Sequence, residues 1–125
     1  MSLHPTRDRL AAFRFALRGL GRMLKGEVHA RVHAAATLAV VGLGLALGVT
    51  RLEWLALLLA IAMVWCAEAF NTAFESICDL VSRDHRPEIE RAKDVAAGAV
   101  LAASIGAAAV GIVVFGPRLL ALLRG

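Results

Sequence analysis

The sequence predicts an all-α integral membrane protein, in which one amphipathic surface helix precedes three membrane-spanning helices. The chain of 125 residues is 59% hydrophobic and has a mean hydropathy of +0.71, whereas ordinary soluble domains are about 45–50% apolar. A chain this short has too little interior to bury that excess in water. The apolar residues also gather in three long runs that basic residues flank, as they do in membrane spans.

The N-terminal segment, residues 7–25, is expected to form the amphipathic helix. Its large apolar residues recur at steps of three and four, which places them on one helical face: Leu10, Phe13, Leu17, Leu20 and Leu24. Its basic residues fall on a different face: Arg14, Arg18, Arg22 and Lys25. Such a helix lies in the membrane interface with its cations toward anionic head groups. A solvated basic face without a specific ligand is the alternative.

The three expected spans occupy about residues 33–50, 54–79 and 94–116. The first contains 16 residues without a charge, and the spacing of Gly44 and Gly48 within it favours close helix contact. The second is apolar as far as Glu68 and should continue as a helix to Val81, because no Gly or Pro interrupts it. The third contains 21 residues without a charge, which is enough to cross a bilayer. Residues 1–125 are thus expected to form one membrane-embedded domain.

Basic residues between the spans predict the orientation of the chain. Seven Lys or Arg precede the first span and four lie between the second and third spans, whereas the loop between the first two spans carries only Arg51. By the positive-inside rule, the N-terminus and the polar loop expected at residues 82–90 face the cytoplasm. The basic residues that give the net charge of +4 flank the apolar runs, so we expect them to contact the anionic membrane surface. No nucleic-acid partner is expected.

Polar residues that follow the apolar part of the second span form the candidate site. Glu68, Asn71 and Glu75 are spaced to lie on one face of a helix, and Asp79 extends this stripe. Carboxylates at a membrane boundary are costly and are usually functional. Two of them could hold Mg²⁺ together with phosphates, and a third could act as a general base. For Asp79, a position at the solvated end of the helix is an equal alternative.

Further candidates lie near the ends of the spans. Glu27 is a lone acid in a basic segment, which by itself suggests a surface ion pair. Lys93 suits a phosphate or the membrane surface, and Asp94 suits a ligand contact or a cap of the third span's helix. His85, among cations, is compatible with a phosphate contact. His33 follows another histidine by four residues, a spacing that can chelate a metal, but no third ligand is evident.

Two sequence segments resemble the signature of the prokaryotic diacylglycerol kinase family. One is Glu68-Ala-Phe-Asn-Thr-Ala-Phe-Glu75, followed by Asp79, and the other is Arg91-Ala-Lys-Asp-Val-Ala-Ala-Gly-Ala-Val100. The resemblance covers about residues 10 to 120, and its details are similar to the Gram-positive undecaprenol kinase branch. His29 stands where that branch usually has Asn, and Phe74 replaces a usual aliphatic residue; neither belongs to the acidic set.

The resemblance implies a homotrimer in the bacterial cytoplasmic membrane that transfers the γ-phosphate of ATP to a lipid hydroxyl, with Mg²⁺. By matching position, Glu68 is the implied catalytic base, and Glu27 and Glu75 are the implied Mg²⁺ ligands. The implied nucleotide contacts are Glu27, Asn71, Glu75, His85, Arg86, Lys93 and Asp94. Similarity to the branch favours undecaprenol over diacylglycerol as the acceptor.

Two other functions compete with a lipid kinase. A small transporter subunit would use an acidic coupling residue near the middle of a span, whereas Glu68 is expected at a cytoplasmic end with further acids beyond it. A membrane scaffold would assemble through small residues of the spans, and its function would survive the substitution Glu68→Ala.

Overall fold

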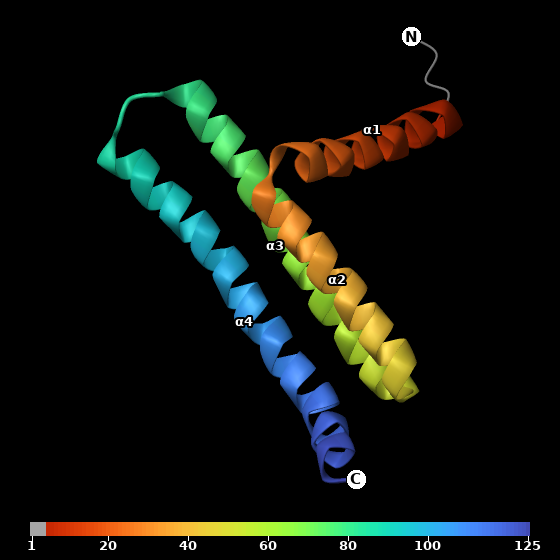
Figure 1. Ribbon diagram of the computed structural model, residues 1–125. Helices are drawn as coiled ribbons and strands as arrows, with labels where there is room; N and C mark the ends of the chain where they lie inside the picture. The colour runs from red at the N-terminus through yellow and green to blue at the C-terminus, as the bar shows by residue number, and fades with distance from the viewer. Residues whose placement is uncertain (1–4) are drawn as a thin grey trace.

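Four helices joined by short turns make up the computed structural model, which describes residues 5–125 and the side chains from Arg9 onward. They are α1 (Pro5–Gly26), α2 (Val28–Leu47), α3 (Arg51–Val81) and α4 (Pro87–Arg124). Helices α2, α3 and α4 run alongside one another, and α1 leaves this bundle at a steep angle (Figure 1). The secondary structure of the described residues is all helical, as the sequence predicts.

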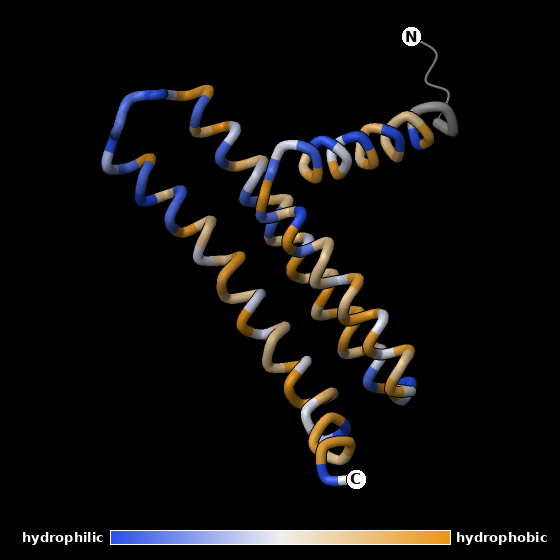
Figure 2. Tube along the Cα trace, viewed as in Figure 1, coloured by the Kyte–Doolittle hydropathy of each residue, from blue (hydrophilic) through white to orange (hydrophobic). Residues whose placement is uncertain are grey.

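The three bundle helices are long and apolar enough to cross a membrane. Figure 2 shows hydrophobic residues along most of their length, whereas the turn between α3 and α4 is hydrophilic. In α1, hydrophilic and hydrophobic residues alternate, in agreement with an amphipathic helix. Its apolar side chains Leu10, Phe13 and Leu17 are exposed. The structure therefore confirms three candidate spans preceded by an amphipathic helix.

Helix α4 begins before the end of the loop that was expected at residues 82–90. It starts at Pro87, directly after Arg86, because proline suits the first helical turn, where its missing N–H removes no hydrogen bond. Asp94 consequently lies inside the helix, so the alternative in which it caps the helix is wrong. At its other end α4 continues through Pro117 to Arg124, since the last residues are mostly Leu and Ala, which favour helix.

The turn between α2 and α3 is defined by two helix caps. Gly48 ends α2 in the left-handed conformation, with φ of 62°, which glycine adopts without strain. Thr50 and Glu53 form a capping box at the start of α3: Thr50 N donates to Glu53 Oε2 (2.7 Å) and Glu53 N donates to Thr50 Oγ1 (3.2 Å). Gly48 thus ends a helix and does not pack against a neighbouring one. The expectation that Gly48 contributes to a close helix contact is therefore wrong.

Gly44, the other half of that pair, does permit a close helix contact. The indole of Trp54 lies against it, so that a Cβ added at Gly44 would stand 2.7 Å from Trp54 Cη2. Near this contact Val49, Leu57, Val114 and Phe115 are buried together. The best-packed part of the bundle therefore lies at the end where α2 turns into α3.

An ion pair joins α4 to α3 at the same end of the bundle. Arg118 Nη1 donates to Glu53 Oε1 (2.7 Å) and also to Val114 O (3.1 Å). Both charged side chains are 27% exposed, so the pair is partly shielded from solvent. The helix caps, the buried apolar cluster and this ion pair all stabilise this end of the bundle. The polar residues of the candidate site lie toward the opposite end.

Candidate active site

Glu68 is a buried carboxylate that faces another helix. It lies on α3 and is 3% exposed, because it follows the apolar part of the span without a break in the helix. Its Oε2 lies 3.5 Å from Nε2 of His33 on α2, whose side chain is 18% exposed. A buried charge is destabilising by several kcal/mol unless it is paired. The imidazole is the polar group that the structure places next to this buried carboxylate.

Helical spacing does not indicate this role of His33. The spacing relates His33 to another histidine on the same helix as a possible metal-binding pair, whereas the structure places the ring against Glu68, 35 positions away in the sequence. One signal could have suggested the pair. His33 lies at the start of the first apolar run and Glu68 at the end of the second, and these two ends meet because consecutive spans run antiparallel.

Asn71 and Glu75 lie on the next turns of α3 and contact each other. Asn71 Nδ2 donates to Glu75 Oε1 at 3.2 Å, as expected for residues four positions apart on one helical face. The Oδ1 atom of Asn71 is buried and accepts no hydrogen bond from the described residues. Leaving a buried amide oxygen without a donor costs about 1–3 kcal/mol. This atom is therefore well suited to accept a hydrogen bond from a ligand.

Glu27 lies at the junction of α1 and α2. It occupies the N-cap position of α2, but its side chain caps no backbone N–H, so the carboxylate stays available. Glu27 lines a cleft of about 760 Å³ between α1 and α3. Small side chains on both helices keep this cleft open, among them Ala16, Gly19, Ala69 and Ala73. The cleft also contains Thr72 and Ser76, which are the sequence neighbours of Asn71 and Glu75.

Lys93 forms an ion pair that links α4 to α3. Its Nζ donates to Oδ1 of Asp79 at 2.7 Å, and the two side chains are 30% and 61% exposed. Exposed ion pairs contribute only about 0–1 kcal/mol to stability. Lys93 can therefore exchange this carboxylate for a phosphate at little cost. Asp79 has a definite role as the partner of Lys93, a contact that helical periodicity alone did not indicate.

The remaining candidates lie around the turn between α3 and α4. His85 is 96% exposed and its Nδ1 lies 3.1 Å from Glu90 Oε1. Arg86 occupies the N-cap position of α4, and Asp94 is exposed on the same helix. His85 and Arg86 lie between α3 and α4, where Figure 2 shows a hydrophilic turn, and Asp94 lies within α4. A role for them in binding a nucleotide remains a prediction.

The described residues offer oxygen ligands for a metal ion, but they do not supply a complete set of protein ligands. Within the described part of the chain, no three His, Cys, Asp or Glu side chains lie close enough together to hold a metal ion. Mg²⁺ usually binds through one or two carboxylates and completes its shell with water and substrate phosphates. The uncapped carboxylate of Glu27 and the carboxylate of Glu75 are of this donor type, so the residues fit Mg²⁺ bound with a phosphate substrate.

These features define a class of protein. The chain is a multi-pass membrane protein whose polar site contains a buried carboxylate at one end of its apolar bundle, with an amide, further carboxylates and a lysine beyond it. Such a site brings charged groups to the depth at which the polar head of a lipid meets the aqueous phase.

Comparison with known proteins places the chain in a family. The family model described as prokaryotic diacylglycerol kinase matches residues 14–115. The undecaprenol kinase of Bacillus subtilis (strain 168) is 34% identical over 108 residues, which cover 86% of this chain and 88% of that protein. The diacylglycerol kinase of Synechocystis sp. is 35% identical over 115 residues, covering 91% of this chain and 66% of that protein. The chain belongs to the prokaryotic diacylglycerol kinase family and is a lipid kinase.

Proposed function

We propose that the chain transfers the γ-phosphate of ATP to the hydroxyl of undecaprenol, in preference to diacylglycerol, with Glu68 as the general base. The observation that carries this proposal is the burial of Glu68 at the polar end of an apolar bundle, where the hydroxyl of a membrane lipid can reach it. Family membership supports ATP and a lipid alcohol as the substrates. The motifs shared with the undecaprenol kinase branch, from Lys93 to Val100, support the choice of lipid.

Phosphoryl transfer depends on positioning and charge neutralisation more than on covalent catalysis. In the proposed step, the oxygen of the lipid hydroxyl bonds to the γ-phosphorus of ATP, the bond to the β-phosphate oxygen breaks, and ADP leaves. The hydroxyl proton passes to Glu68. His33, 3.5 Å from that carboxylate, holds it in place and stabilises its charge before the proton arrives.

The other polar residues are proposed to bind the nucleotide. Asn71 Oδ1 accepts no hydrogen bond from the described residues and could accept one from the nucleotide, and Lys93 would release Asp79 to neutralise a phosphate. Asp94, His85 and Arg86 would complete the contacts from α4 and the turn before it. Mg²⁺ held by Glu27 and Glu75 would supply further positive charge to the phosphates.

We propose that the functional unit is a homotrimer in the bacterial cytoplasmic membrane, with the N-terminus and the site in the cytoplasm. The resemblance to the family supports the trimer. The distribution of Lys and Arg supports the orientation.

The test uses purified protein in mixed lipid–detergent micelles with Mg²⁺ and γ-labelled ATP. Undecaprenol and diacylglycerol are offered in parallel, with Glu68→Gln and, as a matched control, Glu88→Gln, which removes an exposed acid on α4. We expect faster labelling of undecaprenol, loss of labelling in Glu68→Gln and retention in Glu88→Gln. Equal or faster labelling of diacylglycerol would overturn the preference. No labelling of either lipid by folded protein would overturn the function.

A further inference from the structure

Two polar contacts connect α2 to α3 at the end of the bundle that contains the candidate site. The indole of Trp65 on α3 donates from Nε1 to Oγ1 of Thr37 on α2 at 2.9 Å. Closer to the site, Glu68 Oε2 lies 3.5 Å from Nε2 of His33. On α3, Trp65 precedes Glu68 by three residues, and on α2, Thr37 follows His33 by four. Such spacings place each pair on one face of its helix, so the two contacts are consecutive links along one helix–helix interface.

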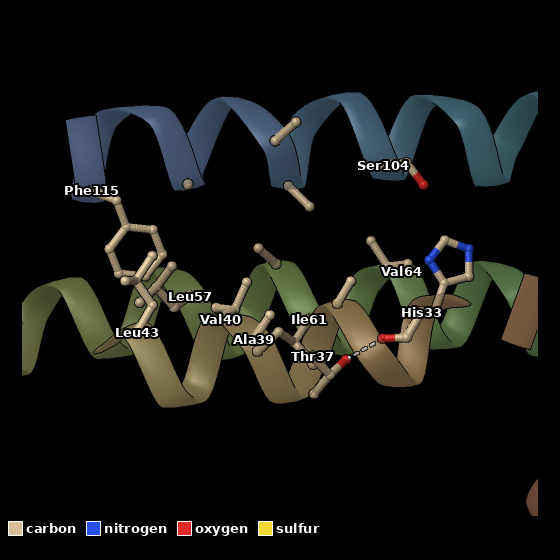
Figure 3. A pocket seen from close by; sticks show the side chains of 15 residues that line it. His33, Thr37, Ala39, Val40, Leu43, Leu57, Ile61, Val64, Ser104 and Phe115 are labelled. Carbon is tan, nitrogen blue, oxygen red and sulfur yellow. Dashed lines mark hydrogen bonds between the residues drawn. The ribbon is translucent and has the colours of Figure 1, made fainter. Parts of the chain in front are cut away.

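A third hydrogen bond joins these two contacts within α2. The hydroxyl of Thr37 donates to the backbone oxygen of His33 at 2.7 Å, and Figure 3 shows this bond as a dashed line. A hydroxyl can donate one hydrogen bond while it accepts another, and Thr37 does both, because it also accepts from Trp65. A continuous chain of hydrogen bonds therefore runs from the indole on α3 to the backbone of His33, whose ring contacts Glu68.

Apolar packing alone does not define the position of α2 at this end of the bundle. Small side chains such as Ala36, Ala60 and Ala107 leave a space of about 370 Å³ between α2, α3 and α4, and His33 and Thr37 line it. Side chains that border a space have fewer partners to interlock with, so α2 has room to shift. Directional hydrogen bonds between membrane-spanning helices restrict such a shift.

We infer that Trp65 and Thr37 are positioning residues for the general base, because they hold His33 where it contacts Glu68. The inference rests on the proposed function, since it adds two residues to the proposed transfer step. Neither residue belongs to the groups proposed to bind ATP, so their loss should lower kcat and leave the KM for ATP unchanged. A hydrogen bond that only joined two helices would affect stability and leave the kcat of folded protein unchanged.

Conservative substitutions test the chain by kinetics. Trp65→Phe removes the N–H and keeps an aromatic ring, and Thr37→Val removes the hydroxyl and keeps the shape of the side chain. We expect each to lower kcat for undecaprenol about tenfold, with unchanged KM values, and we expect Thr37→Ser to retain the wild-type rate. The matched control is Trp54→Phe, because that indole packs against Gly44 at the opposite end of the bundle. A wild-type kcat in Thr37→Val, or an equal loss in Trp54→Phe, would overturn the inference.

A double-mutant cycle shows whether the chain acts through His33. In a His33→Gln background the chain no longer ends on an imidazole, so Thr37→Val should lower the remaining kcat by less than about twofold. For the same reason, Trp65→Phe should add little to the effect of Thr37→Val. A second loss of about tenfold in the His33→Gln background would show that Thr37 acts independently of His33, and would overturn the inference.

Nuclear magnetic resonance tests the chain without turnover, in micelles and with ¹⁵N-labelled Trp and His. Thr37→Val should move the indole N–H signal of Trp65 and the ring signals of His33. The indole signal of Trp54 and the ring signals of His85, whose side chain is 96% exposed, should stay in place. Unmoved His33 signals would overturn the inference, because the ring would then not depend on the chain.

The two kinds of assay separate failure of this inference from failure of the proposed function. Moved His33 signals without phosphorylation of any lipid by the wild-type protein would refute the function and retain the hydrogen-bonded chain. Phosphorylation at the wild-type rate by Thr37→Val would refute the inference and retain the function.

Discussion

Replacing Gly44 by alanine should destabilise the hairpin of α2 and α3, because the new Cβ would stand 2.7 Å from Trp54 Cη2. Two opposing effects determine the change in the free energy of unfolding. Alanine favours helix over glycine by about 1 kcal/mol, whereas overpacking costs about 1–3 kcal/mol. At Gly42 of the same helix, no atom lies within 4 Å of an added Cβ, so Gly42→Ala has only the favourable effect. The difference in unfolding free energy between the two variants isolates the clash and should be about 1–3 kcal/mol.

The assay is thermal unfolding of both variants in one lipid–detergent mixture. The Tm of Gly44→Ala should lie below that of Gly42→Ala, and a Trp54→Leu background, which removes the indole, should abolish most of the difference. Equal Tm values for the two variants, or a difference that persists without Trp54, would refute the packing argument.

Four further predictions concern the site and the bundle ends. His33→Gln should lower kcat by about 10- to 100-fold while the KM for ATP stays constant, because Glu68 would no longer be held in the correct position to accept the hydroxyl proton. An unchanged kcat would exclude a positioning role for His33. Lys93→Met should raise the KM for ATP and leave the KM for lipid unchanged, as initial rates would show. Thr50→Ala should cost about 1 kcal/mol of stability through loss of the α3 cap, seen as a lower Tm with kcat retained. Chelation by EDTA should abolish activity, and added Mg²⁺ should restore it; activity that survives EDTA would contradict the proposed metal.

Some features of the candidate site could be predicted from the sequence, and others could not. The stripe of Glu68, Asn71 and Glu75 follows from helical spacing, and the hydrogen bond of Asn71 to Glu75 confirms the shared face for these two residues. The position of Glu68 directly after the apolar run was also expected, whereas its burial against α2 was not. The pairing of Lys93 with Asp79 was not, because it joins two helices across a turn whose length the sequence overestimated.

Similar limits apply to the glycines and prolines. The spacing of Gly44 and Gly48 predicts one packing motif, but the turn needs a left-handed residue at Gly48, and of these two glycines only Gly44 contacts a neighbour. The polar residues around Pro87 predict a loop, although proline is also a frequent first residue of helices. In both cases one residue type serves two local structures, and the surrounding chain selects between them.

The sequence by itself determined the helical class, the three candidate spans, the acidic stripe and the family, because these depend on composition and on spacing within one helix. Only the tertiary structure decided which helices face each other. It placed His33 against Glu68, Trp65 against Thr37 and Arg118 against Glu53, residues separated by 28 positions or more. Such contacts depend on the angle and rotation at which apolar helices pack, and many arrangements bury similar apolar area. The apolar space between α2, α3 and α4 exists for the same reason, since small residues leave a space only where the three helices bring them together.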